Sequence, residues 1–189
     1  LDYSFAYRLL AKEVAWDSRL EEAVQEPALK EMLKRHKEEQ QRIAASMEDK
    51  AFYLPWPELD GNAVMQKILE KHSGKVVFLD IWATWCGPCR MGHEQMKPMK
   101  EQYAGKDVVF VYITPPSSPV NKWQEMITEI DGEHYYLSDN QTRAILSTFE
   151  SHGFPTYAVY DRNGNMTFKE VGLTGNSTYS SAIDNALKR

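Results

Sequence analysis

The chain has 189 residues, enough for one domain of ordinary size and an additional segment. Hydrophobic residues make up 42% of it and aromatic residues 12%, so the chain can bury a core and does not have the composition of a disordered protein. Its net charge of −5 argues against general attraction to nucleic acid, and no apolar run approaches the roughly 20 residues that cross a bilayer.

The chain begins at Leu1 without an initiating methionine and without a basic and apolar signal segment. We therefore expect a fragment or a processed product, in which missing targeting signals do not indicate the compartment. Anchoring to a membrane is expected only through sequence that precedes Leu1.

Residues 1–48 are predicted to form a helical extension. Apolar residues recur at helical spacing through the first 24 positions, with charged residues between them. Pro27 either ends that helix or begins a second one that runs to about residue 47, and two antiparallel helices or one kinked helix both fit the pattern. Residues 52–57 contain two prolines and are predicted to form an extended linker.

From about residue 58, helix and strand patterns alternate. Two apolar runs, 76–81 and 108–113, are typical of buried strands, and Asn163-Gly164 between two later strands indicates a hairpin. The order predicts an α/β domain over residues 49–189, with a mixed sheet flanked by helices. Further strands are expected at 135–137, 156–160 and 166–171, and helices at 63–71, 89–103, 121–130, 140–150 and 177–187.

The only two cysteines lie in Trp85-Cys86-Gly87-Pro88-Cys89. This spacing lets one sulfur attack a disulfide while the other resolves the product. Gly87 and Pro88 favour a tight turn that opens into a helix, and the helix N-terminus stabilises a thiolate at Cys86. A bridge across so short a loop restricts the unfolded chain very little, so a redox role is favoured over a structural disulfide.

A metal site is disfavoured by the same cysteines. Two cysteines cannot supply four thiolates, and His72 and His93, which could complete a Cys2His2 set, do not have zinc-finger spacing. We therefore expect no metal, and no cofactor other than a redox-active disulfide between Cys86 and Cys89.

Residues 79–90, Leu-Asp-Ile-Trp-Ala-Thr-Trp-Cys-Gly-Pro-Cys-Arg, resemble the active-site segment of thioredoxins. With Ala-Thr before Trp-Cys and Arg after the second cysteine, the segment is most similar to the TlpA/ResA branch of thiol–disulfide oxidoreductases. Residues 153–156, Gly-Phe-Pro-Thr, match the cis-proline loop of that family. The resemblance covers roughly residues 50–189 and leaves the helical extension outside.

The resemblance implies a thioredoxin-like fold and an enzyme that reduces protein disulfides through a mixed disulfide. Cys86 would be exposed and attack, and a buried Cys89 would resolve. The implied partners are a disulfide-containing protein and a separate electron-donor protein. Members of this branch are commonly exported and often anchored at the envelope, so we expect a bacterial protein of the periplasm or cell envelope.

Asp80 lies near the end of a buried-type strand, six residues before Cys86. A carboxylate there is costly unless it is hydrogen-bonded or protonated, so its pKa should rise. Asp80 matches the family position that exchanges a proton with the resolving cysteine, although many exported relatives carry Asn there. The alternative is that Asp80 is a hydrogen-bonded residue at the end of the strand and has no role in proton transfer.

Five residues are predicted to contact the substrate: Trp85, Gly87, Pro88, Phe154 and Pro155. By the family match Pro155 is the cis residue, and its bend would present the backbone of Phe154 to an extended substrate segment. Trp82 is expected to lie in the core. His93 and Glu94 follow the motif on the same helix and either could assist proton transfer, but both are expected to be exposed helix residues.

Two other classes of protein are compared with the oxidoreductase. A peroxiredoxin would need proline and threonine at the positions that Leu79 and Ala83 occupy, so that class is rejected. A thioredoxin-fold binding or assembly module with a vestigial or regulatory cysteine pair is the remaining alternative, and the intact motif together with Asp80 and Pro155 argues against it.

Overall fold

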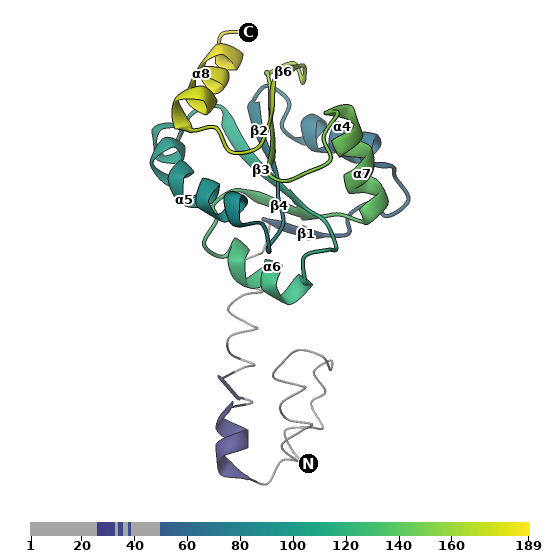
Figure 1. Ribbon diagram of the computed structural model, residues 1–189, viewed down its shortest axis with the longest axis vertical. Helices are drawn as coiled ribbons and strands as arrows, with labels where there is room; N and C mark the ends of the chain where they lie inside the picture. Colours follow the sequence, from purple (N-terminus) through teal and green to yellow (C-terminus); the bar gives the residue numbers. More distant parts are fainter. Residues whose placement is uncertain (1–25, 33, 36–37, 39–49) are drawn as a thin grey trace. The chain divides into compact units, whose positions relative to one another are not determined.

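The computed structural model describes residues 26–32, 34–35, 38 and 50–189 (Figure 1). The chain divides into two units, Leu1–Glu48 and Asp49–Arg189, and each is described by itself. The described residues of the first unit are helical from Pro27 onward, and the Glu26 carboxylate accepts a hydrogen bond from the Leu29 N–H at 3.2 Å. A helix beginning at Pro27 is one of the two alternatives that the sequence left open. The rest of the predicted extension lies outside the described residues, and its status as a separate domain stays a prediction.

From α4 onward, the second unit alternates strands and helices in the order that the sequence predicts, with bounds that differ by a few residues. The elements are β1 (Ala51–Tyr53), α4 (Gly61–Lys71), β2 (Val76–Ile81), α5 (Gly87–Gln102), β3 (Val108–Thr114), α6 (Val120–Ile127), β4 (Glu133–Tyr136), α7 (Asp139–Thr148), β5 (Thr156–Tyr160), β6 (Met166–Val171) and α8 (Asn176–Leu187). Among the described residues, no helix combines the length and the apolar composition needed to cross a bilayer.

The strands form one six-stranded sheet in the order β1-β4-β3-β2-β5-β6. The four strands β1, β4, β3 and β2 run parallel to one another. Strand β5 runs antiparallel to β2, and β6 runs antiparallel to β5. Helices α4 and α7 cover one face of the sheet, and α5 and α8 cover the other (Figure 1). The predicted mixed sheet with helices on both faces is confirmed.

The predicted linker at residues 52–57 is partly wrong, because the chain forms edge strand β1 there. Phe52 pairs with Tyr135 of β4 in parallel register, and their rings stack at 4.7 Å between centroids. The Leu54 N–H continues the pairing by donating to the Tyr136 carbonyl at 2.8 Å. After β1 the expected extended backbone is absent, because Leu54 and Trp56, the residues before the two prolines, have φ angles of 43° and 50° in the left-handed region.

Helix α6 begins one residue before the range 121–130 that the sequence predicts, and it ends earlier, at Ile127. The helix starts at Val120, directly after Pro119, and has no side-chain cap. The Asn121 carboxamide accepts instead from the neighbouring Lys122 N–H at 2.8 Å. Proline fixes a φ compatible with helix, here −56°, so the turn can start without a capping side chain.

Strand β2 is buried along its whole length and separates two packed layers. Because side chains alternate across a strand, Val77, Leu79 and Ile81 enter the apolar cluster under α4 and α7. Phe78 and Asp80 point to the other face, where Phe78 meets Tyr179 of α8 at 5.5 Å between ring centroids. The same alternation directs the Asp80 carboxylate toward α5.

Gly61 marks the close approach of α4 to α7. A Cβ at this position would lie 2.1 Å from the Gln141 carbonyl oxygen, so Gly61→Ala must push the two helices apart. We expect a loss of about 1–3 kcal/mol in the free energy of unfolding, measured by urea denaturation. Asn62→Ala, an exposed change in the same turn, is the control. Equal stability of the two variants would contradict this packing argument.

Candidate active site

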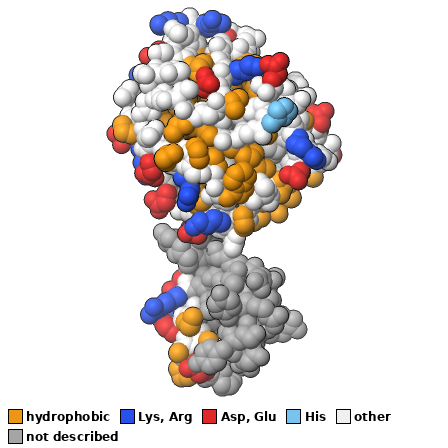
Figure 2. Space-filling model, viewed as in Figure 1, with side chains coloured by type: hydrophobic (Ala, Val, Ile, Leu, Met, Phe, Trp, Pro, Cys, Tyr) orange, Lys and Arg blue, Asp and Glu red, His pale blue; other side chains and the backbone are white. Residues whose placement is uncertain are grey.

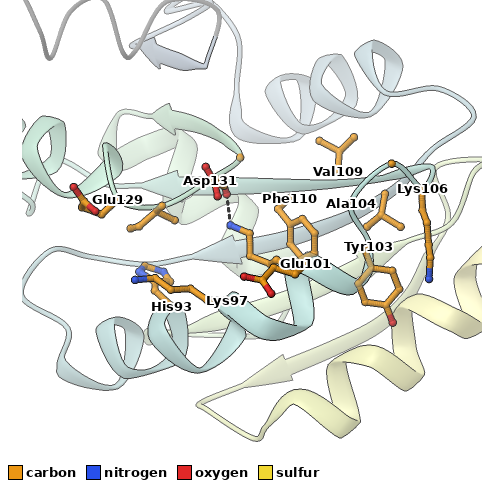
Figure 3. Close-up of a pocket in the computed structure, with 15 residues that line it drawn as sticks. His93, Lys97, Glu101, Tyr103, Ala104, Lys106, Val109, Phe110, Glu129 and Asp131 are labelled. Carbon is orange, nitrogen blue, oxygen red and sulfur yellow. Dashed lines mark hydrogen bonds between the residues drawn. The ribbon is translucent and has the colours of Figure 1, made fainter.

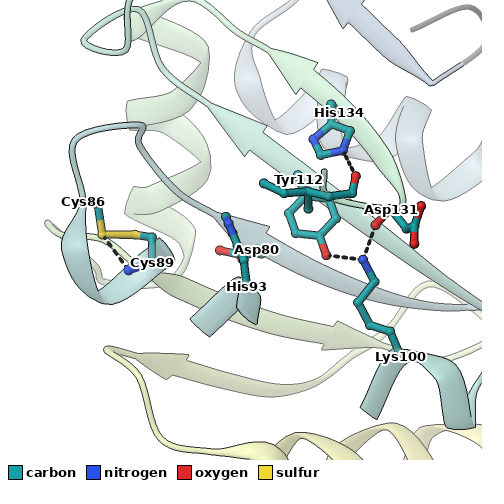
Figure 4. Close-up of polar contacts among 9 residues, drawn as sticks. Asp80, Cys86, Cys89, His93, Lys100, Tyr112, Asp131 and His134 are labelled. Carbon is teal, nitrogen blue, oxygen red and sulfur yellow. Dashed lines mark hydrogen bonds and ion pairs between the residues drawn. A yellow bond between two sulfur atoms is a disulfide. The ribbon is translucent and has the colours of Figure 1, made fainter. Parts of the chain in front are cut away.

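The two cysteines occupy the start of α5. Cys86 is the N-cap residue, and its sulfur accepts a hydrogen bond from the Cys89 N–H at 3.1 Å. The sulfurs form a disulfide, with the two Cα atoms 5.3 Å apart (Figure 4). Pro88 lies in the first turn, where its missing N–H costs no helical hydrogen bond. The turn and helix predicted from Gly87-Pro88 are therefore both present.

The two sulfur-bearing residues are both buried in this oxidised form. Cys89 is 0% exposed, as the resemblance implies, but Cys86 is only 4% exposed. The expectation of an exposed Cys86 is therefore wrong for the disulfide state. The physical reason is the capping contact, which turns the Cys86 sulfur over the first turn of α5 instead of outward.

The proline loop adjoins the cysteine motif. The Phe154–Pro155 peptide bond is cis, as the family match predicts. The Phe154 ring meets the Trp85 ring edge to face at 5.8 Å between centroids, which brings the loop against the residue before Cys86. Behind the bend, the Thr156 hydroxyl donates to the Gly153 carbonyl at 2.8 Å.

The residues predicted to contact substrate differ in accessibility. Trp85 is 60% exposed, Pro88 is exposed, Gly87 and Phe154 are half-buried, and Pro155 is buried. Other large hydrophobic side chains are also accessible on the second unit, and Figure 2 shows hydrophobic side chains gathered on the viewed face. An accessible aromatic ring beside the disulfide provides an apolar contact for a protein chain. Binding of substrate by these five residues stays a prediction.

Asp80 contacts a residue whose position the sequence pattern predicted wrongly. The Asp80 carboxylate, 0% exposed, lies 2.9 Å from Nε2 of His93 through its Oδ2 atom (Figure 4). The expectation that His93 is an exposed helix residue is wrong, since it is 6% exposed, whereas Glu94 is exposed as expected. Helical spacing could have indicated this, because His93 follows Cys89 by four residues and so shares its inward face.

Burial governs the electrostatics of Asp80. Desolvation raises the pKa of its carboxyl above the ordinary 3.8, and the hydrogen bond and charge of His93 partly oppose that rise, as does the charge of Lys100. Within the described structure the second oxygen, Oδ1, is buried and has no hydrogen-bond partner. A carboxylate in this state accepts a proton readily, which is the property that the sequence predicts for Asp80.

Beyond His93, the face under α5 holds a second polar group. Lys100 Nζ donates to the Tyr112 hydroxyl at 2.9 Å and to the Asp131 carbonyl (Figure 4). Burial lowers the pKa of Lys100 to about 8, against the raising effects of Asp131 and Asp80. The His93 ring meets the Tyr112 ring edge to face at 5.6 Å between centroids.

Trp82 lies in the core, as predicted. It is 0% exposed, and its ring packs edge to face against His93 at 4.8 Å between centroids. Trp82 therefore contacts the histidine that pairs with Asp80.

The two histidines considered as metal ligands lie in separate ion pairs. His72 contacts Glu133 of β4 at 3.0 Å, whereas His93 contacts Asp80 of β2. Within the part of the chain that the structure describes, no group of three or more His, Cys, Asp or Glu side chains could hold a metal ion.

A thioredoxin-like sheet with a Cys-Gly-Pro-Cys turn at a helix N-terminus and a cis-proline loop beside it defines the thioredoxin-fold class. The family model described as Redoxin matches residues 44–187, and the chain belongs to that family. The chain is similar to the thiol-disulfide oxidoreductase ResA of Bacillus cereus, with 26% identity over 61% of this chain and 64% of that protein. It is also similar to the thiol:disulfide interchange protein DsbE of Yersinia pestis, with 28% identity over 65% of this chain and 61% of that protein.

Solved structures agree with the fold. A thiol:disulfide interchange protein of the thioredoxin family from Chlorobium tepidum superposes with a TM-score of 0.56 at 23% identity, over 62% of this chain and 83% of that one. A DsbF homologue from Corynebacterium diphtheriae gives the same TM-score of 0.56 at 23% identity, over 62% and 75%. The chain spans less than two thirds of the length of the ResA and DsbE proteins named above.

Proposed function

We propose that the protein is a thiol–disulfide oxidoreductase that reduces disulfides in other proteins. The observation that carries this proposal is the bonded Cys86–Cys89 pair at the start of α5, with the cis-Pro155 loop beside it. The similarity to the thiol-disulfide oxidoreductase ResA and the thiol:disulfide interchange protein DsbE supports the same activity.

In the reaction, the reduced protein presents Cys86 as a thiolate at the N-terminus of α5. The Cys89 N–H already points at this sulfur in the oxidised form, and a hydrogen bond from that N–H stabilises negative charge there. The thiolate attacks one sulfur of the substrate disulfide, which forms a Cys86–substrate mixed disulfide and releases the other substrate sulfur as a thiolate.

Resolution requires the buried Cys89 to lose its proton. Oδ1 of Asp80, which has no partner among the described residues, faces the same layer between β2 and α5 and accepts that proton. The Cys89 thiolate then attacks the Cys86 sulfur, closes the Cys86–Cys89 disulfide and expels the second substrate thiolate. Two electrons pass from the dithiol to the substrate disulfide.

The direction of electron flow is tested by the reduction potential. A reductant should have a potential between about −200 and −300 mV, measured by equilibration with defined ratios of reduced and oxidised dithiothreitol or glutathione. A value near the ~−120 mV of strong disulfide oxidants would reverse the proposed direction while leaving the oxidoreductase class in place.

The alternative is a binding or assembly module with a regulatory or vestigial cysteine pair. The catalysed reduction of insulin by dithiothreitol separates the two functions. We expect turnover by the chain and none by its Cys86→Ser variant. Absence of turnover in both would favour the binding module.

The proposed partners are a disulfide-containing protein and a separate electron-donor protein. An extended substrate segment would lie along the Phe154–Pro155 backbone and against the exposed Trp85 ring. We also propose that the protein works in the bacterial cell envelope, as its resemblance to the TlpA/ResA branch implies. Exposure to a membrane-impermeant thiol reagent in intact cells tests this location.

A further inference from the structure

A cavity of about 510 Å³ lies between α5, from His93 onward, and the sheet (Figure 3). Its wall includes the buried His93 and the exposed side chains of Lys97, Glu129 and Asp131. The exposed members give the cavity access to water, and the buried member contacts Asp80. The cavity is therefore a route between solvent and the Asp80–His93 pair that does not cross the surface around the disulfide.

We propose that His93 is a positioning residue for the resolving step: it keeps Asp80 in the carboxylate form that accepts the Cys89 proton at Oδ1, and it releases a ring proton to water in the cavity beside α5, so that the Asp80–His93 pair takes up one proton and gives up one. The proposal rests on the proposed function. The two oxygens of the Asp80 carboxylate have different surroundings. Oδ2 lies 2.9 Å from His93 Nε2, whereas Oδ1 has no hydrogen-bond partner in the described structure.

A proton route through the cavity is useful because the bound substrate covers the surface around the disulfide. During resolution a protein substrate is bonded to Cys86 and lies over Trp85 and the Phe154 loop, so water has poor access to Cys89 from that side. The proton that Cys89 loses must still leave Asp80 before the next cycle. His93, one helical turn after Cys89 and in contact with Asp80, connects the buried carboxylate to the cavity.

Most other ionisable groups around the pair titrate far from neutral pH. Burial raises the pKa of Tyr112 and of Tyr157, which are the strand neighbours of Asp80, and lowers that of His134 to about 4. The pKa of Lys100, about 8, lies at the upper edge of the neutral range. The remaining titratable groups that face this layer or line the cavity are Tyr179 on α8, Lys97 and Glu101 on α5, Tyr103 and Lys106 after α5, Glu129 and Asp131 before β4, and the two cysteine thiols. In the mixed disulfide Cys86 no longer titrates, so the protonation of Cys89 and of the buried Asp80, which His93 contacts at 2.9 Å, governs the rate of resolution.

The test separates the two chemical steps with a symmetrical aromatic disulfide. Attack by Cys86 releases the first coloured aryl thiolate, and resolution by Cys89 releases the second, so one stopped-flow trace gives both rates. His93→Gln removes the charge that lowers the pKa of Asp80, so that pKa rises and the carboxylate form is lost at low pH. We expect resolution at pH 6 to slow about tenfold or more, and its acid limb to move upward by about one pH unit or more. The first release should change less than about twofold.

The matched control is His72→Gln. His72 is also buried and also paired with a carboxylate, Glu133 at 3.0 Å, but it lies at the end of α4, which covers the opposite face of the sheet. This variant should leave the pH profile of resolution unchanged. An unshifted profile in His93→Gln, or equal slowing of both releases, would overturn the role of His93. Failure of the wild-type chain to give any release would instead overturn the proposed function.

A second variant tests the cavity as the route. His93→Ala opens the cavity toward Asp80, and imidazole in solution should restore at least about half of the lost resolution rate. His93→Gln retains a side chain at that place and should gain less than about twofold from imidazole. Lack of rescue in a folded His93→Ala variant would overturn the proton route. If that variant does not fold, the route is judged by hydrogen exchange of the buried His93 ring in the wild-type protein, measured by NMR, and an exchange rate slower than turnover would overturn it.

Discussion

Replacing Cys86 with Ser is expected to abolish disulfide reduction, with a loss of about three orders of magnitude or more in turnover. A serine hydroxyl is not ionised near neutral pH, and the helix N-terminus that stabilises a thiolate cannot make it a comparable nucleophile. The measurement is insulin reduction with dithiothreitol as the electron source. The fold should survive, because serine is a favourable N-cap residue and can replace the capping contact of Cys86 with the Cys89 N–H.

Cys89→Ser is the matched variant, with a different expected result. Cys86 can still attack, but the mixed disulfide has no resolving thiol and accumulates. Mass spectrometry after mixing with a disulfide-containing peptide should therefore show one covalent adduct per chain in Cys89→Ser and none in Cys86→Ser. Adduct formation by Cys86→Ser would reverse the assignment of attacking and resolving sulfurs.

The reacting residues could be predicted from sequence because their chemistry depends on local spacing. Cys86 and Cys89 lie within one turn, and a Gly-Pro pair between them predicts the helix start that the structure contains. The cis-proline loop could be predicted only through the family match, since most bonds that precede proline are trans. Its contact with Trp85 joins segments far apart in the chain, which spacing alone does not reveal.

The incorrect predictions concern residues whose positions depend on tertiary packing. His93 is polar and lies among charged neighbours, so its surroundings in the sequence indicate an exposed helix face. Its spacing of four residues from Cys89 indicates the inward face of α5, but its contact with Asp80 follows only when α5 is placed over β2 and the alternation of β2 turns Asp80 toward it. Strand β1 could not be distinguished from a linker for the same reason, because so short a strand is stabilised by the aromatic rings of β4 rather than by its own sequence.

Asp80→Asn is expected to slow the resolution of the mixed disulfide by about 10²-fold or more while the first attack changes little. The amide keeps the shape of the side chain but cannot accept the Cys89 proton. The two releases from an aromatic disulfide, followed by stopped flow, measure both steps. Equal slowing of the two steps would mean that Asp80 acts on the whole site and not on Cys89.

The same substitution should stabilise the protein, with an effect that depends on pH. Because burial raises the folded-state pKa of Asp80 above the ordinary 3.8, the stability that Asp80 contributes is fully present below pH 3.8 and is lost as pH rises through the folded-state pKa. The asparagine side chain of the variant carries no charge at any pH. Its advantage should therefore grow from about pH 4 to pH 8 and reach about 1–3 kcal/mol.

Urea denaturation of the oxidised wild-type and Asp80→Asn proteins at these two pH values measures the difference in the free energy of unfolding. A variant that loses resolution without gaining stability at the higher pH would show that burial does not destabilise the carboxylate. Loss of resolution together with a gain of stability is the pattern expected of a buried group that is retained for proton transfer although it destabilises the fold.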